Sequence, residues 1–144
     1  MLRTLLAVLC MAVLTAACQR TEPAWTPPAY GTDKCAACGA VIAASRYAAQ
    51  LQRADGAVLS FDDPVCLMRT QKGEAPGAVR FHDEREDGWS DGTRAWFARV
   101  PGQTSPKGEG WAAFSGFAAA QDAVAGAGSG EILPFDQARE RLGR

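Results

Sequence analysis

The sequence is poor in the residues on which most enzyme chemistry depends. It has one histidine, His82, in 144 residues, which leaves little for general acid–base catalysis. It also lacks the carboxylate pair, phosphate-binding glycine loop or serine–histidine–aspartate arrangement that would indicate a hydrolase. Its formal net charge of −1 gives no electrostatic basis for binding nucleic acid. We therefore expect neither a hydrolase nor a nucleic-acid-binding protein.

Long apolar runs are equally scarce, and the run near the N-terminus is short. It extends from Leu5 to Leu14 behind Arg3, which is typical of a secretory signal and too short to span a bilayer. The following Leu14-Thr15-Ala16-Ala17-Cys18 resembles a bacterial lipoprotein box. We predict a signal peptide over 1–17 and a lipidated Cys18 that anchors the chain to a membrane of the bacterial cell envelope, facing the periplasm. The alternative is an ordinary signal cut at the alanine pair, with Cys18 unmodified.

The segment after the signal is polar and rich in proline. We predict that 18–32, from the lipidated N-terminus onward, tethers a domain to the membrane. About 110 residues follow, enough for one ordinary domain or two very small ones.

The first half of this remainder predicts the order β-β-α-β. Alternating residues at 47–52 and 57–61 flank Asp55-Gly56, a hairpin turn signal. Asp63 is a candidate N-cap and Pro64 a candidate first residue of a helix that extends to about 71. A third strand is expected at 79–82, followed by a solvated charged loop over 83–91.

The second half repeats that order. Strands are expected at 95–100, 110–114 and 131–133, with a helix over 116–124 capped by Ser115 and a terminal helical turn or two at 136–142. The prediction is an α+β fold of two similar small β-β-α-β halves, 33–91 and 92–144. This order indicates a weak internal duplication in which only the first copy carries thiols.

Three cysteines remain to be explained once the signal and the lipid account for Cys10 and Cys18. They are Cys35 and Cys38, in a Cys-x-x-Cys-Gly motif, and Cys66. Three thiols cannot all pair as disulfides, and thiolates bind soft metal ions. A Cys-x-x-Cys-Gly turn can direct both sulfurs to one point. We therefore predict a metal site made by Cys35, Cys38 and Cys66.

Several alternatives stay open from the residues alone. Cys35 and Cys38 could form a structural disulfide beside a buried Cys66, or act as a redox pair. His82 could complete a Cys₃His zinc site or be a surface residue of its strand. Met68 could supply a thioether to Cu(I), although residues 66 and 68 of a helix face different sides, which favours a core position. The helix N-terminus favours a Cys66 thiolate, whereas Asp62 and Asp63 oppose it.

The sequence resembles the NosL family, the nitrous oxide reductase accessory lipoproteins. The resemblance is carried by Asp33 to Gly39, Tyr47 to Leu51, Phe61-Asp62-Asp63 with Cys66, Ala95-Trp96-Phe97, and the stretches 114–124 and 130–136. It implies two similar β-β-α-β halves, Cu(I) binding, and delivery of copper to a cuproenzyme such as nitrous oxide reductase. The protein would then be a metallochaperone and not an enzyme.

Two positions depart from the family pattern. Ala40 stands where the family usually has methionine, and Pro106-Lys107-Gly108-Glu109-Gly110 replaces a methionine–glycine motif of the second half. Two soft ligands are therefore absent, but two thiolates can hold Cu(I) linearly and a third makes the site trigonal. The other functions considered are a thiol–disulfide oxidoreductase, and a structural zinc or disulfide knuckle in a protein-binding lipoprotein.

Overall fold

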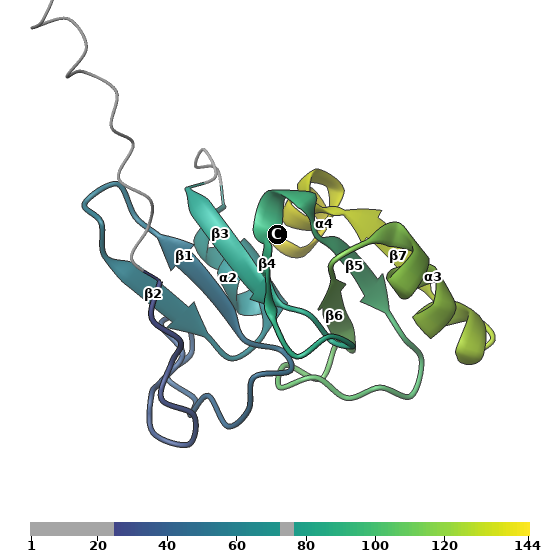
Figure 1. Cartoon of the computed structure of the whole chain (residues 1–144), viewed down its shortest axis with the longest axis horizontal. Coiled ribbons are helices and arrows are strands. Elements are labelled where there is room, and N and C mark those ends of the chain that lie inside the picture. Colours follow the sequence, from purple (N-terminus) through teal and green to yellow (C-terminus); the bar gives the residue numbers. More distant parts are fainter. Residues whose placement is uncertain (1–24, 73–76) are drawn as a thin grey trace, which may run out of the picture.

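The structure, a computed structural model, describes residues 25–72 and 77–144. The predicted signal peptide and Cys18 lie outside these residues. Within the described part, no helix has the length and apolar character needed to cross a membrane. Two antiparallel sheets stand side by side, one from each half of the chain (Figure 1).

The first half forms a four-stranded sheet and one helix. Its strands are β1 (Ala49–Gln52), β2 (Val58–Phe61), β3 (Ala78–His82) and β4 (Trp89–Asp91), in the spatial order β2-β1-β3-β4. The turn between β1 and β2 contains Gly56 at φ +85°, a conformation that glycine adopts at no steric cost. Helix α2 (Pro64–Thr70) connects β2 to β3. The hairpin predicted at Asp55-Gly56 is confirmed.

The second half repeats this arrangement with three strands. A short 3-10 turn (Gly92–Arg94) leads into β5 (Trp96–Arg99), β6 (Trp111–Phe114), α3 (Phe117–Gly126), β7 (Glu131–Pro134) and α4 (Phe135–Leu142). The spatial order β6-β5-β7 places the second, first and third strands as in β2-β1-β3. The predicted α+β class with two similar β-β-α-β halves is confirmed, with β4 and α4 as additions.

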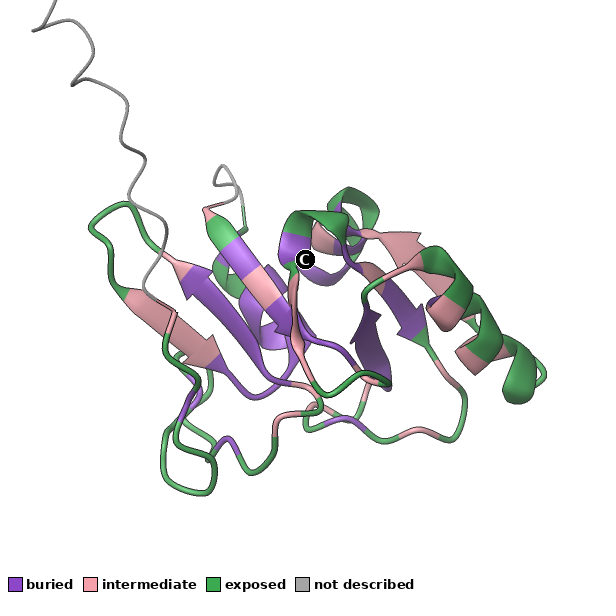
Figure 2. Ribbon diagram, in the orientation of Figure 1, coloured by how far each residue is buried: buried purple, intermediate pink, exposed green. Residues whose placement is uncertain are grey.

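One hydrophobic core joins the two halves. The rings of Phe81 and Phe97, from β3 and β5, meet edge to face with centroids 4.8 Å apart, and Phe135 lies 6.2 and 6.4 Å from them. Such an aromatic pair contributes about 0.5–1.5 kcal/mol beyond its burial. Helices α2 and α4 contact each other across the same core, whereas α3 is largely exposed on its outer side (Figure 2).

Two local predictions need correction. The stretch 83–91 is not simply a solvated loop, because Asp83 is 3% exposed and Trp89–Asp91 forms β4. The cap of α3 is Gly116, with no side-chain hydrogen bond, and not Ser115. The Ser115 N–H instead donates to the carboxylate of Asp83.

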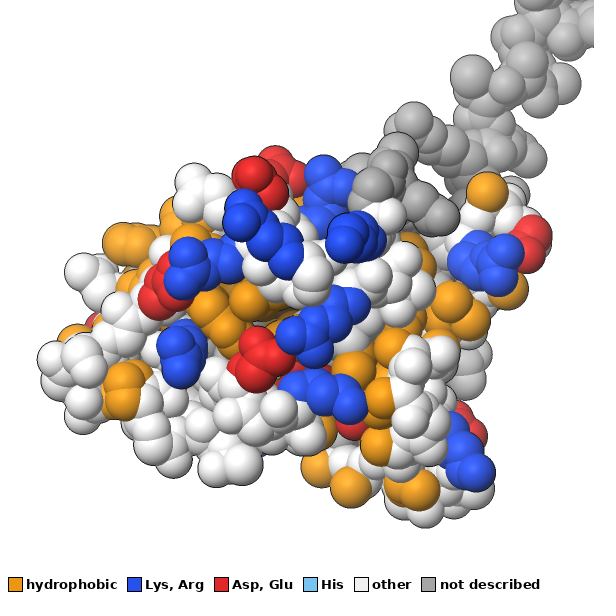
Figure 3. Space-filling view, turned by 180° about the vertical axis from the view of Figure 1, so that it is seen from behind, with side chains coloured by type: hydrophobic (Ala, Val, Ile, Leu, Met, Phe, Trp, Pro, Cys, Tyr) orange, Lys and Arg blue, Asp and Glu red, His pale blue; other side chains and the backbone are white. Residues whose placement is uncertain are grey.

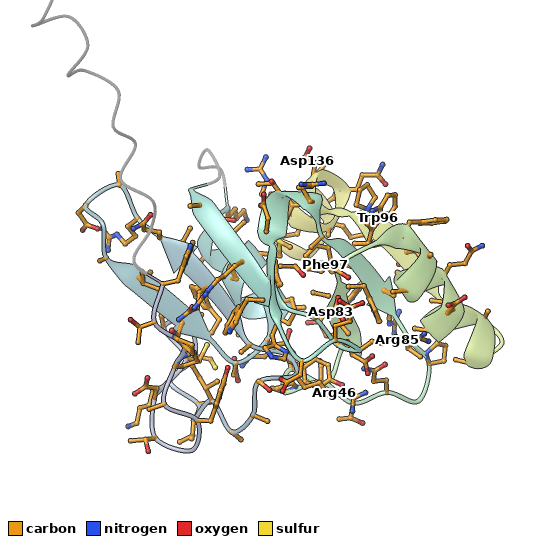
Figure 4. The ribbon with its side chains drawn as sticks, in the orientation of Figure 1. Arg46, Asp83, Arg85, Trp96, Phe97 and Asp136 are labelled. Atoms are coloured by element: carbon orange, nitrogen blue, oxygen red, sulfur yellow. The ribbon has the colours of Figure 1, made fainter. Side chains whose placement is uncertain are left out.

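Asp83 explains both corrections because it connects the halves. Its Oδ1 accepts from the N–H groups of Arg85 and Glu86 at 2.7 and 2.8 Å, and its Oδ2 accepts from Ser115 at the end of β6. Figure 4 shows Asp83 at the junction between the sheets. Burial pushes the pKa of Asp83 upward, but these N–H donors outweigh it and the pKa is lowered overall.

We predict that Asp83→Asn destabilises the protein at neutral pH by about 2–4 kcal/mol, because hydrogen bonds to a charged group are strong. A carboxylate with a lowered pKa stabilises the fold above its unfolded pKa, and this stabilisation is lost as pH falls through the folded pKa. The difference in free energy of unfolding from the wild type, measured in urea, should therefore shrink toward acidic pH.

Asp122→Asn is the matched control, since it removes the same charge from an exposed side chain that pairs with Arg85 at 3.7 Å. It should change the free energy of unfolding by less than about 0.5 kcal/mol. Equal effects of the two substitutions would contradict the role assigned to Asp83.

Candidate metal site

The Cys-x-x-Cys motif forms a tight knuckle closed by backbone hydrogen bonds. The Cys35 N–H donates to the Ala40 carbonyl at 2.8 Å, and the Gly39 N–H donates to the Cys35 carbonyl at 2.9 Å. Gly39 has φ +74°, a backbone conformation that glycine adopts at no steric cost. The knuckle buries Cys35 to 3% exposure and leaves Cys38 exposed.

The knuckle is attached to the strand that leads to the third cysteine. The Ala36 N–H donates to the carbonyl of Ser60 in β2 at 2.9 Å. One residue further on, Phe61 ends the strand, and Asp62 and Asp63 form the turn into α2. This single long-range hydrogen bond places residues 35–38 beside the start of the helix.

Helix α2 begins as the sequence predicts. Asp63 is its N-cap and accepts the Val65 N–H at 2.9 Å, and Pro64 is the first helical residue. Cys66 is consequently the third helical residue and lies one turn from the cap, 3% exposed.

These three elements bring four potential ligand atoms together. The sulfurs of Cys35, Cys38 and Cys66 and a carboxylate oxygen of Asp62 all lie within 4.8 Å of one another. Both Asp62 oxygens are 3.7 Å from the Cys38 sulfur. Cys35, Asp62 and Cys66 are buried. We call this set the thiol cluster: Cys35, Cys38, Asp62 and Cys66.

All three cysteines are free thiols, and two of them share a proton. A hydrogen bond from Cys66 lowers the pKa of Cys35 to about 6, against the opposing effect of burial. The same hydrogen bond, followed by burial, raises the pKa of Cys66. The sequence left open whether the pKa of Cys66 is raised or lowered. The neighbouring Cys35 raises it, so Cys66 is the partner that keeps the proton. The lowered pKa of Cys35 favours its thiolate, the form that binds metal.

A loop of the second half reaches the cluster. The Lys107 N–H donates to Asp63 Oδ2 at 2.9 Å. The Lys107 ammonium interacts with the Cys38 sulfur, and this hydrogen bond is the main cause of the raised pKa of Lys107. A cation therefore faces the cluster from the stretch where the family resemblance would place a methionine.

The remaining candidate ligands lie elsewhere or face other partners. His82 does not belong to the thiol cluster. Its side chain is 6% exposed, so the alternative of a surface residue is wrong. Its Nε2 lies 3.2 Å from an Asp87 oxygen, and its Nδ1 lies 3.1 Å from the Asp83 carbonyl oxygen. Met68 is fully buried in the main core. A role for either residue as a ligand stays a prediction.

Sequence reasoning missed Asp62 as a candidate ligand and Lys107 as a neighbour of the sulfurs. For Asp62 a signal existed: the N-cap accounts for Asp63, and nothing local accounts for a second aspartate beside it. For Lys107 there was none, because a polar loop 41 residues after Cys66 in the sequence has no local feature that places it.

The fold resembles that of a solved structure, the copper chaperone NosL from Shewanella denitrificans. The two superpose with a TM-score of 0.67 and 21% sequence identity, over 80% of this chain and 96% of that chain. No family model and no curated protein matches the sequence. The chain therefore has a NosL-like fold, and at this identity the likeness extends to the fold alone.

We predict that one thiolate forms in the reduced protein as pH rises, with a midpoint near the pKa of Cys35, about 6. Cys66→Ala removes the hydrogen-bond donor, so this midpoint should rise toward the ordinary cysteine range. Thiolate absorbance in the ultraviolet, followed against pH under anaerobic conditions, measures the midpoint. Cys38→Ala serves as the control and should leave this first step in place. A midpoint that does not move in Cys66→Ala would contradict the shared proton.

Proposed function

We propose that this protein is a membrane-tethered, periplasmic Cu(I)-binding accessory protein that delivers copper to a cuproenzyme, such as nitrous oxide reductase. Cys35, Cys38 and Cys66 hold the ion as cargo, and no catalytic residue is assigned. The observation that carries the proposal is the convergence of three free thiols from two distant segments on one point. The NosL-like fold supports it.

The donor set suits a soft monovalent ion. Thiolates are the ligands that favour Cu(I), and three of them bind it in trigonal geometry. The site holds more thiolates than the family pattern would give, and this compensates for the two methionines that Ala40 and the 106–110 loop replace. The lowered pKa of Cys35 favours the thiolate that such an ion needs.

The unequal exposure of the sulfurs suits transfer by ligand exchange. Cys38 is exposed while Cys35 and Cys66 are buried, so an acceptor's ligand reaches the ion from the Cys38 side. The residues around Cys38 are small or apolar and exposed: Ala36, Ala37, Gly39, Ala40 and Val41. In Figure 3 the lobe formed by this part of the chain, at the lower right, shows hydrophobic side chains at its surface. An acceptor protein can approach such a surface closely.

The geometry of the motif does not favour a thiol–disulfide oxidoreductase. In redox proteins of the thioredoxin type the motif opens a helix after a strand. Here Cys35 and Cys38 lie in a turn bracketed by a bridge between Lys34 and Val41, and the helix N-terminus belongs to Cys66.

We predict that the full chain binds one Cu(I) when Cys10→Ser and Cys18→Ser leave only three of its five cysteines. In that background, Cu(I) binding should weaken by at least about 10–100-fold on each of three single changes, Cys35→Ser, Cys38→Ser and Cys66→Ser. Removing a residue that only hydrogen-bonds to a metal ligand already costs that much affinity. Anaerobic competition with a Cu(I) chelator measures the affinity.

His82→Gln is the control in the same titration. Its ring faces Asp87 and the Asp83 carbonyl, so the Cu(I) affinity should not change. Failure of the three-thiol background protein to compete for Cu(I), or an affinity that survives Cys38→Ser, would overturn the proposed function.

A further inference from the structure

The two adjacent aspartates before α2 have different surroundings. Asp63 is fully buried, and its oxygens accept backbone N–H groups of Val65 and Lys107. Asp62 is 4% exposed. Both of its carboxylate oxygens lie 3.7 Å from the Cys38 sulfur, which donates to them, and the sulfurs of Cys35 and Cys66 lie within 4.8 Å of the carboxylate. Asp63 therefore stabilises the fold through backbone hydrogen bonds, whereas the Asp62 carboxylate faces the sulfurs.

A buried carboxylate among thiols is unfavourable unless a cation joins it. Taking an ionised carboxylate out of water costs several kcal/mol unless it is paired or coordinates a metal. The exposed Lys107 ammonium interacts with Cys38 and, by charge, with Asp62, so it offsets part of the negative charge from the outer side of the cluster. The buried side, formed by Cys35, Asp62 and Cys66, is rich in donor atoms.

The spacing of the four donors matches a tetrahedral ion. Zinc binds sulfur at about 2.3 Å and carboxylate oxygen at about 2.0–2.2 Å, which separates tetrahedral donors by about 3.5–3.8 Å. The Cys38 sulfur and the Asp62 oxygens are already 3.7 Å apart, and no pair of donors in the cluster exceeds 4.8 Å. Small side-chain rotations would close the site around one ion.

We propose that Asp62 is the fourth donor of a second binding mode, in which the thiol cluster holds a borderline divalent cation such as Zn²⁺ through three sulfurs and one carboxylate oxygen. Cu(I) binds in the same place through the sulfurs alone, because a carboxylate is a hard ligand that it does not favour. A divalent ion also offsets one more negative charge than Cu(I) does. Asp62 thus sets the selectivity of the cluster between the two ions.

This inference goes beyond copper delivery. The Zn²⁺ mode rests on the four converging donors and not on an acceptor protein, whereas the selectivity of the cluster between Zn²⁺ and Cu(I) also rests on the proposed function. It also supplies a fourth ligand for zinc in place of His82.

The test compares Asp62→Asn with the parent protein, both as the full chain carrying Cys10→Ser and Cys18→Ser. Asparagine keeps the shape of the side chain and removes the charge. Zn²⁺ and Co²⁺ affinities are measured by competition with chelators, Cu(I) affinity is measured in parallel, and the visible bands of bound Co²⁺ report its donor set. The parent should bind Co²⁺ tetrahedrally and bind Zn²⁺ more weakly than Cu(I).

In Asp62→Asn we expect the Zn²⁺ and Co²⁺ affinities to fall by at least about 10-fold, with a shift of the visible Co²⁺ bands. Cu(I) affinity should stay within about threefold or rise, since a negative charge beside an anionic copper–thiolate site is removed. A retained Cu(I) affinity also shows that the variant folds.

Asp33→Asn is the charge-matched control, because Asp33 lies two residues before Cys35, is exposed, and accepts the Ala29 N–H at 2.8 Å. It should leave all three affinities unchanged. The proposal is overturned if the parent binds no divalent ion, if Asp62→Asn keeps its Zn²⁺ affinity, or if Zn²⁺ and Cu(I) weaken equally, which would make Asp62 a structural residue.

Discussion

The carboxylate of Asp63 is the point on which the arrangement of the site depends. One oxygen caps α2 through Val65, and the other accepts the Lys107 N–H from the second half. Burial raises the pKa of Asp63, and the two N–H groups oppose this rise. Burying the acid is therefore unfavourable in itself, but the buried carboxylate joins two segments of the chain. That junction fixes the start of α2, which carries Cys66, and holds Lys107 beside the thiol cluster.

A second long-range contact completes the site from the other direction. The hydrogen bond from Ala36 to Ser60 attaches the knuckle to β2, so that Cys35 meets Cys66 and the two share a proton. One buried sulfur lies on the knuckle and one on α2, and the exposed sulfur of Cys38 lies on the knuckle. Two donors are thus inside the protein and one is at its surface, and thiolates suit soft metals.

Local chemistry made much of the fold predictable. Asp63-Pro64 specified the start of α2, Asp55-Gly56 specified the first hairpin, and alternating residues located the strands to within one or two positions at most ends. The three cysteines could be selected because the signal and the lipid account for Cys10 and Cys18 and because two of the rest form a Cys-x-x-Cys motif. What could not be predicted depends on contacts between the two halves: the buried Asp83 that accepts from Ser115, and the approach of Lys107 to Cys38. No local pattern encodes these contacts, because each needs both halves to be folded.

The adjacent aspartates illustrate how one site can serve two demands. Asp63 has its hydrogen bonds satisfied by the backbone, and Asp62 is left to the sulfurs, so the same turn builds the helix and adds charge to the cluster.

The central claim is that the three thiols form one Cu(I) site. X-ray absorption at the copper edge of the Cu(I)-loaded full chain carrying Cys10→Ser and Cys18→Ser tests it most directly. The account predicts a first shell of three sulfurs with no nitrogen or oxygen. A shell containing an imidazole nitrogen, or fewer than three sulfurs, would contradict it.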